Sequence, residues 1–338
     1  LEDRTWLRRD ASGRLTHFQG MVLDITERRR AEMALLESER NLAEAQRIAR
    51  LGNWSLEWPS RRLQWSAESF VIAGLRPSRE APSFSTYLEM VHPEDRVGLD
   101  TALQESVVRD RPFDMEVRHR LPDGSWNHTQ VKGQPVREGS RVVRIFGTLL
   151  DITDRKRAEQ AQQSLTEGLR IVLQLADELI ACPSEDSLYL RSVELARQRL
   201  GLERCGIMIR RGKEICGTYG TDMEGGTTVE QDHRIILDET WRERLRVRET
   251  HEQRWSLVEE PFRYWKDGRL VDVKSGWIAI TPIQSSMQGA IGVFSNDTAI
   301  SGAPPDPIKQ EVLAVFCSLL GNMVARKRAE EEQDHALQ

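Results

Sequence analysis

A thirteen-residue sequence, called the repeated phrase below, occurs twice in this chain, and this repetition constrains the fold more than any other feature. Residues 20–32 and 147–159 agree at nine positions and lie 127 residues apart, and the tail of the phrase returns over residues 326–330. Each copy passes from an apolar, strand-like run into a charged, helix-like run. The sequence therefore predicts a modular chain that reuses one strand-to-helix joint, an organisation typical of signalling relays.

The bulk composition fits about two or three domains. The chain has 338 residues, a net charge of −5 and a pI of about 5.9, which predicts no large basic surface for nucleic acid or for anionic membrane. No apolar run approaches the ~20 residues that span a bilayer. Because the chain begins at Leu1, without a Met and in mid-pattern, we interpret it as a fragment, which leaves upstream membrane segments open.

Cysteine usage points to a reducing compartment. The four cysteines, at 182, 205, 216 and 317, form no Cys-x-x-Cys pair, and no histidine pair stands at zinc-finger spacing. We therefore expect a cytoplasmic protein with unpaired thiols, no metal site and no disulfide.

We expect linker helices over residues 27–50 and 154–181. The first segment contains neither glycine nor proline. Both carry apolar residues at alternating steps of three and four, the spacing of a coiled-coil seam. The first seam comprises Ala31, Leu35, Ser38, Leu42, Ala45 and Ala49, and the second comprises Ala158, Ala161, Leu165, Gly168, Val172, Leu175 and Leu179. Two such seams predict a parallel homodimer.

Three further segments surround these helices, and a fourth closes the chain. Residues 1–26 predict two strands, and because two strands alone are marginal, we interpret them as the end of a truncated domain. Residues 51–153 predict a compact domain with short helices near 66–72 and 85–90, a helix from 93 to about 108, and strands over 113–121, 125–135 and 142–152. Residues 182–325 predict a second domain, and 326–338 begin an output linker helix.

The second domain is expected to start with a helix over 185–200. Strands follow over 205–210, 214–220, 277–282 and 289–294, and a helix begins at 308. Between them lies a long charged stretch in which we expect a helix near 239–246.

The first domain resembles a PAS domain along its length. The matching stretches are Gly52-Asn-Trp54, His92-Pro-Glu-Asp-Arg96 and Leu121-Pro-Asp-Gly-Ser-Trp126, and both copies of the repeated phrase carry the Asp-Ile-Thr that closes the last PAS strand. By the same resemblance, residues 1–26 look like the last two strands of an earlier PAS domain.

The second domain resembles a GAF domain through softer motifs. These are Ala176-Asp-Glu-Leu, Glu194-Leu-Ala-Arg-Gln-Arg-Leu-Gly201, Tyr219-Gly-Thr-Asp222 and Gly289-Ala-Ile-Gly-Val293. The resemblance implies a five- or six-stranded antiparallel sheet with terminal helices on one face. The fold class expected for the whole chain is thus α+β, with tandem PAS-like and GAF-like domains joined by coiled-coil-type helices.

Strings of PAS and GAF domains resemble the input halves of bacterial sensor histidine kinases and diguanylate cyclases. The resemblance implies detection of an unknown small molecule or partner, relayed through dimeric helices to an output domain in cis, most simply a histidine kinase. The chain itself carries no nucleotide-binding or phosphoacceptor pattern, so we expect no catalysis. The rival hypothesis is a passive dimerisation scaffold with empty domains, and ligand-induced stabilisation would separate the two.

The repeated joint supplies the candidate relay residues. Thr26 and Thr153 fit an N-cap, and the basic residues that follow, such as Arg28 and Arg155, oppose the helix dipole. Asp24 and Asp151, two residues before each threonine, can bond free amides and pair with an arginine. The alternative is a plain strand-to-helix connection with solvated basic residues.

Candidate pocket residues are aromatic. In the first domain they are Trp54, Trp58 and Trp65, and in the second Tyr219, Trp241, Trp255 and Trp277; the competing interpretation of each set is ordinary core. His92 could ligate haem but stands in a helix-start pattern. The absence of cysteine before 182 argues against cysteine-based flavin photochemistry, and the absence of a Cys-His pair argues against bilin, so the sequence names no cofactor.

Overall fold

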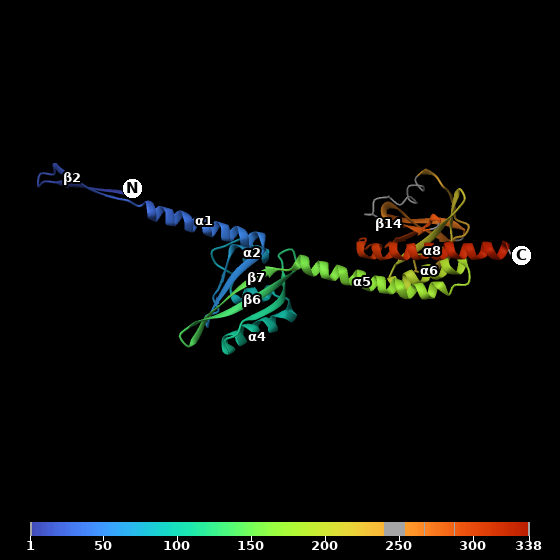
Figure 1. Ribbon diagram of the computed structural model, residues 1–338, viewed down its shortest axis with the longest axis horizontal. Helices are drawn as coiled ribbons and strands as arrows, with labels where there is room; N and C mark the ends of the chain where they lie inside the picture. Colours follow the sequence, from blue (N-terminus) through green and yellow to red (C-terminus); the bar gives the residue numbers. More distant parts are fainter. Residues whose placement is uncertain (1, 240–253, 267, 287, 337–338) are drawn as a thin grey trace. The chain divides into compact units, whose positions relative to one another are not determined.

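The computed structural model describes residues 2–239, 254–266, 268–286 and 288–336 (Figure 1). The chain divides into two compact units, Leu1–Arg157 and Ala158–Gln338. Each unit combines helices with antiparallel sheet, as the sequence predicts, and each is described by itself.

The first unit opens with a hairpin and a helix. Strands β1 (Glu2–Arg9) and β2 (Leu15–Leu23) pair antiparallel around a turn in which Gly13 takes a φ of 84°. Helix α1 (Thr26–Ile48) follows, and none of its side chains is buried. The strand-to-helix change expected from the first copy of the phrase is therefore present.

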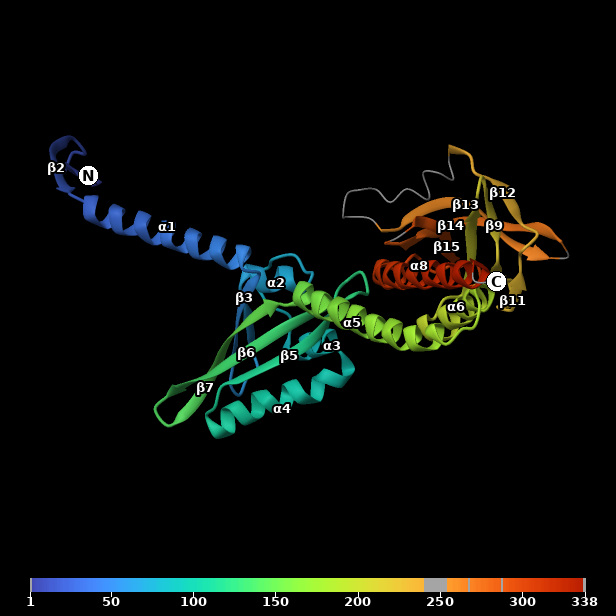
Figure 2. The same cartoon turned by 45° about the vertical axis from the view of Figure 1, so that its right-hand side comes forward.

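A five-stranded antiparallel sheet forms the core of the first unit. Its order is β4-β3-β7-β6-β5, and Figure 2 shows α2, α3 and α4 beside it. The elements, in chain order, are β3 (Leu51–Glu57), β4 (Leu63–Trp65), α2 (Ala67–Ile72), α3 (Phe84–Met90), α4 (Pro93–Arg109), β5 (Phe113–Arg120), β6 (Trp126–Glu138) and β7 (Arg141–Asp151). The elements from α2 to β7 agree with the sequence expectations to within a few residues, because local apolar periodicity and turn residues mark their ends. The short strand β4 was not expected.

Gly147 of the repeated phrase allows β7 to pack against its neighbours. It pairs with Trp54 of β3 and with Gly133 of β6. A Cβ at this position would lie 2.0 Å from the Lys132 carbonyl oxygen and 2.6 Å from the Trp54 ring. Glycine is therefore required here by close approach.

A six-stranded antiparallel sheet, ordered β12-β9-β8-β15-β14-β13, organises the second unit. Helices α5 (Thr153–Ile180), α6 (Glu185–Leu200) and α8 (Pro307–Ala336) share one hydrophobic core with one face of this sheet. The strands are β8 (Arg204–Arg211), β9 (Glu214–Gly217), β12 (Arg234–Ile236), β13 (Ser256–Lys266), β14 (Arg269–Ser285) and β15 (Gly289–Asp297), beside a two-stranded hairpin of β10 (Tyr219–Thr221) and β11 (Thr227–Val229).

Two sequence expectations for the second unit are wrong. The long charged stretch before Trp277, in which no strand was expected, contains all of β13 and the first half of β14. Cross-strand pairing holds charged residues there that local propensity would not place in a strand. The seam of 154–181 is used within the chain: Val172, Leu175 and Leu179 are at most 3% exposed in the core, and Gly168 lies against Val312. The helix expected near 239–246 lies outside the described residues, apart from its first residue.

One helix in the described part of the chain, Pro307–Gln333, is long and apolar enough to cross a bilayer by length and composition, contrary to the sequence expectation. Its apolar residues lie in the core of the second unit. Val312, Phe316, Leu320 and Val324 are at most 4% exposed there.

Candidate functional site

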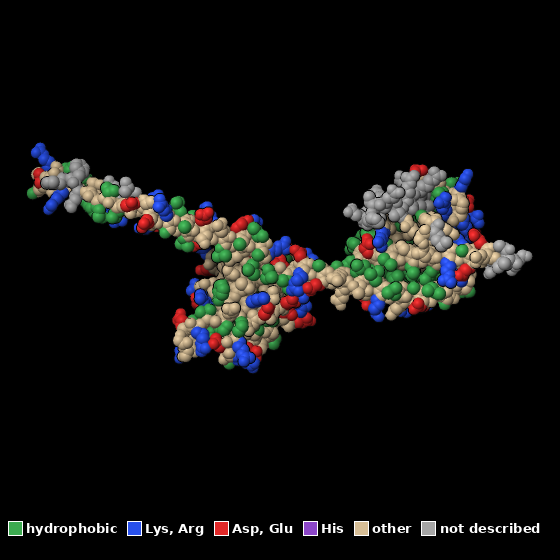
Figure 3. All heavy atoms as spheres, in the orientation of Figure 1, with side chains coloured by type: hydrophobic (Ala, Val, Ile, Leu, Met, Phe, Trp, Pro, Cys, Tyr) green, Lys and Arg blue, Asp and Glu red, His purple; other side chains and the backbone are tan. Residues whose placement is uncertain are grey.

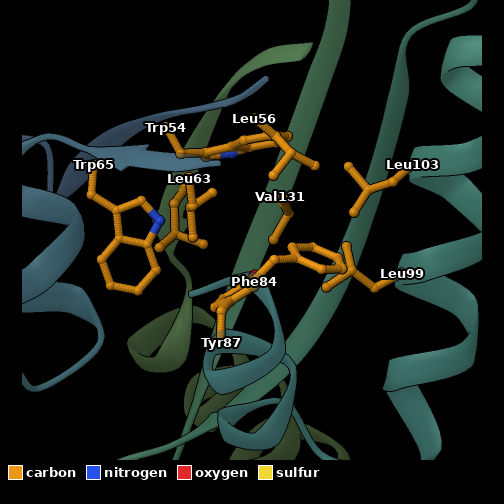
Figure 4. A pocket seen from close by; sticks show the side chains of 10 residues that line it. Trp54, Leu56, Leu63, Trp65, Phe84, Tyr87, Leu99, Leu103 and Val131 are labelled. Carbon is orange, nitrogen blue, oxygen red and sulfur yellow. The ribbon is translucent and has the colours of Figure 1, made fainter. Parts of the chain in front are cut away.

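An apolar cavity of about 20 Å³ lies between the sheet and the helices of the first unit. Figure 4 shows its lining side chains converging from β3, β4, β6, α3 and α4. The lining residues are Trp54, Leu56, Leu63, Trp65, Phe84, Tyr87, Leu99, Leu103, Val131 and Leu149. This volume holds roughly one water, so a larger ligand requires a lining side chain to move.

The three tryptophans named from the sequence have different surroundings. Trp54 lines the cavity and donates from Nε1 to the Thr148 carbonyl at 3.2 Å. Trp65, on edge strand β4, also lines it and makes edge contacts with the Phe70 and Tyr87 rings, at centroid distances of 5.2 and 5.7 Å. Trp58 does not line it, because β3 ends at Glu57 and the Arg61 guanidinium covers its ring.

A buried polar chain, not foreseen from the sequence, joins one wall of the cavity to the sheet. The Tyr87 hydroxyl lies 3.0 Å from His119 Nε2, and His119 Nδ1 lies 2.8 Å from the Thr129 hydroxyl. Burial lowers the pKa of His119 to about 4, so the imidazole is neutral at pH 7. The sequence did contain a signal for a buried His119, because it stands two residues after Val117 and therefore on the same inward face of β5.

His92 caps a helix, as expected from the helix-start pattern. Its Nδ1 accepts a hydrogen bond from the Glu94 amide at 3.4 Å, Pro93 is the first residue of α4, and the ring packs against Trp126. His92 does not line the cavity.

Both copies of the joint use the aspartate in the same way. Asp24 Oδ1 accepts a hydrogen bond from the Thr26 amide, and Asp151 Oδ1 accepts one from the Thr153 amide, each at 2.9 Å. The Thr26 hydrogen bonds lower the pKa of Asp24. Each carboxylate therefore stabilises the positive end of the following helix, a role that the sequence had divided between aspartate and threonine.

The predicted N-cap role of the threonines is wrong. The cap position of α1 is Ile25, which makes no side-chain cap bond, and Thr26 is already helical. Thr153 is also the first helical residue, and its hydroxyl accepts a hydrogen bond from the His128 amide of β6 at 3.0 Å. Thr153 thus fastens the helix start to the sheet.

The arginines of the joint form ion pairs with glutamates. Arg28 pairs with Glu32 one turn along α1. Arg155 and Lys156 both bind Glu116 of β5, at 2.8 and 2.6 Å, and these hydrogen bonds, led by Lys156, lower the pKa of Glu116.

Asp151 faces Arg50, which lies two residues after the end of α1. The Arg50 Nη1 lies 3.9 Å from Asp151 and 2.8 Å from Asp154. Sequence spacing could not find Arg50 or Glu116, because both partners come from distant elements.

The three described aromatic candidates of the second unit each bind a different local partner. Tyr219 donates its hydroxyl to Asp186 at 2.6 Å, Trp255 Nε1 donates to Glu311 at 2.8 Å, and Trp277 Nε1 donates to the Ala303 carbonyl at 2.9 Å. Trp241 lies outside the described residues. Each described ring is fixed by its local partner.

Charges of both signs are interspersed over the face shown in Figure 3. Among the described residues, no group of three or more His, Cys, Asp or Glu side chains could hold a metal ion. The site is therefore an apolar cavity with a charged joint at the end of the same sheet.

Comparison with known proteins identifies a matching family and several relatives. Residues 62–149 match the model of the PAS fold. The chain is 30% identical over 163 residues to the blue-light-activated histidine kinase of Brucella ovis, covering 44% of the chain and 32% of that protein. It is 24% identical over 174 residues to the probable diguanylate cyclase DgcE of Escherichia coli K12, covering 52% of the chain and 16% of that protein.

A solved structure of a sensory box histidine kinase/response regulator from Burkholderia thailandensis is 29% identical, with a TM-score of 0.33, and the match covers 38% of this chain and 97% of that one. The chain spans under a third of the length of the curated relatives named above. Residues 62–149 therefore form a PAS domain, homologous to the sensory regions of bacterial histidine kinases and diguanylate cyclases.

Proposed function

We propose that this chain is a sensory input module that detects a small molecule in the PAS cavity and relays the change through α5 to the second unit and to an output domain in cis. The second unit acts as a GAF domain, the output is a histidine kinase, and the module works in the cytoplasm. The names of the relatives and the four free, buried cysteines support this assignment.

One observation carries the proposal: the cavity wall and the helix start are neighbours on one strand. Leu149 of β7 lines the cavity and pairs with Val131, another lining residue. Two residues later, Asp151 binds the first amide of α5. A ligand that shifts β7 at Leu149 therefore acts on Asp151, which lies only two residues further along the same strand.

The cavity favours a small, uncharged, mostly apolar ligand. Its lining contains no charged side chain, and transfer of an unpaired charge into such a site is costly. Trp65 is the side chain best placed to move, because it is partly exposed on an edge strand and the described residues give its indole nitrogen no hydrogen bond. The small volume also supports the rival proposal, an empty PAS domain that serves only assembly.

Binding of small aromatics separates the sensor from the scaffold. We expect indole, toluene or phenol to raise the Tm of the PAS transition by roughly 10 °C or more at about 100 times Kd. Trp54 and Trp65 line the cavity, so tryptophan fluorescence should change in parallel. Val131→Ile, which adds one methylene to the wall, should weaken the response. No shift with any of the three compounds would favour the scaffold.

Asp151→Ala tests the relay in the full-length protein. The loss of the cap and of the attraction to Arg50 should cost about 1–2 kcal/mol and leave the fold intact. Output activity should then stay at one level with and without stimulus, while ligand binding persists.

Asp151→Asn is the matched control for the cap, because its side-chain oxygen still accepts from the Thr153 amide but carries no charge. Arg155→Lys should impair the stimulus response less than Asp151→Ala, since the ammonium keeps the positive charge beside Glu116. A normal stimulus response in Asp151→Ala would reduce the joint to a plain connection.

A further inference from the structure

The third basic run, residues 326–330, follows no Asp-Ile-Thr and has no part in the relay proposed above. It lies in α8, and its Arg328 contacts α6. Arg328 Nη2 and Nε donate to the two carboxylate oxygens of Glu185, at 2.8 and 3.1 Å, and Nη2 lies 3.4 Å from the Tyr189 hydroxyl. This is a two-pronged fork, the stronger class of ion pair.

The surroundings of Glu185 favour a charged carboxylate at this position. It is the first residue of α6, after a capping box of Ser184 and Ser187, so the helix dipole favours its negative charge. The buried Tyr189 donates its hydroxyl to the same carboxylate. Burial alone would raise the pKa of Glu185, but the hydrogen bonds from Arg328 and Tyr189 lower it overall.

The pair lies where α8 leaves the core of the second unit. Val324 and Ala325 are its last core residues, at 0% and 2% exposed, and residues 331–333 are exposed. The side chains of Arg328 and Glu185 are only 24% and 18% exposed. The neighbouring Arg326–Glu330 pair, within α8 itself, is 78% and 44% exposed.

The second copy of the phrase makes the same kind of attachment. There Arg155 and Lys156, in the first turn of α5, share the single carboxylate of Glu116 from the sheet of the PAS domain. In both cases a basic residue of the run ties a departing helix to one glutamate of the domain that the helix leaves.

We propose that Arg328 is the exit anchor of the second unit, a positioning residue that fixes the direction of α8 where it departs. The basic run is then the element common to both exits, and Asp-Ile-Thr belongs only to the exit that follows a strand. A change at the α6 start would reach the departing helix through Glu185 and Arg328. The meaning of this anchor for signalling rests on the proposed relay, but the anchoring can be measured without it.

The test is a distance measurement in the whole chain. Nitroxides are attached after Arg234→Cys on β12 and Glu332→Cys on α8, since both positions are exposed and the four native cysteines are buried. We expect a narrow distance distribution in the parent protein. Arg328→Gln and Glu185→Gln should each broaden it roughly twofold or more, as a released helix end samples more directions.

Three variants separate the anchor from general stability. Glu330→Gln weakens the pairs with Arg326 and Lys327, which lie within α8 itself, and should leave the width unchanged. The charge swap of Glu185→Arg with Arg328→Glu should restore only part of the narrow distribution, because the α6 dipole and the Tyr189 hydroxyl favour a negative charge at 185. Arg328→Lys should broaden the distribution less than Arg328→Gln, since the ammonium keeps the charge. Unchanged widths in Arg328→Gln and Glu185→Gln, or equal broadening in Glu330→Gln, would overturn the anchor. Neither result bears on ligand binding by the PAS domain.

Discussion

Replacing Leu35 and Leu42 of α1 together with lysine is expected to convert a dimeric chain into a monomer. Both side chains lie on the predicted seam and are about 60% exposed in the single chain, at 62% and 60%. Burial of a leucine contributes about 1.5–3 kcal/mol, and a dimer would bury four. The double variant should therefore lose about 6 kcal/mol or more, which weakens dimerisation by about 10⁴-fold.

The matched control places the same two charges elsewhere on α1. Met33 and Leu36 are 65% and 52% exposed and point roughly 160° and 140° away from the seam. Met33→Lys with Leu36→Lys should leave the dimer intact in sedimentation velocity experiments at tens of micromolar. A wild-type chain that is already monomeric there, or equal dissociation in both variants, would refute the seam.

The second seam, on α5, packs within the chain, and this bears on the predicted dimer. Leu165, Val172, Leu175 and Leu179 serve the core of the second unit, and Gly168 packs against Val312 of α8. Of the described seam, this leaves Ala158 and Ala161 outside these contacts. A dimer that depends on coiled helices must therefore depend mainly on α1.

Gly147→Ala is expected to destabilise the PAS domain by about 3 kcal/mol or more, at the upper end of overpacking costs. The added Cβ would collide with the Lys132 carbonyl and with the Trp54 ring, which cannot both yield without moving β6 and the cavity wall. For a domain of this size, the loss lowers Tm by roughly 10–20 °C. Calorimetry of the chain should show the PAS transition moving alone.

Gly98→Ala supplies the control for this change. Gly98 lies inside α4, and its added Cβ would meet only the Met115 methyl at 3.7 Å. Because alanine favours a helix interior over glycine, this variant should gain roughly 0.5–1 kcal/mol. A Gly147→Ala chain as stable as the parent would show that β7 adapts freely at this point.

Much of the PAS domain could be read from the sequence, because its signals are local. Alternation over 113–121, the proline and acids after His92 and the turn at 122–124 each fix an element through neighbours in the chain. The cavity was found only in part. Trp54 and Trp65 were named, but Tyr87 and His119 were missed, and Trp58 was included because alternation does not show where a strand ends.

The sequence by itself determined the repeated joint, the order of strands and helices in the PAS domain and the presence of an apolar seam on each linker helix. Tertiary structure decided which groups these features meet. Asp151 faces Arg50, Arg155 and Lys156 share Glu116, and the α5 seam lies in the core of the second unit. Periodicity fixes the direction in which a side chain points along its own element, whereas the identity of its partner depends on elements that lie far away in the sequence.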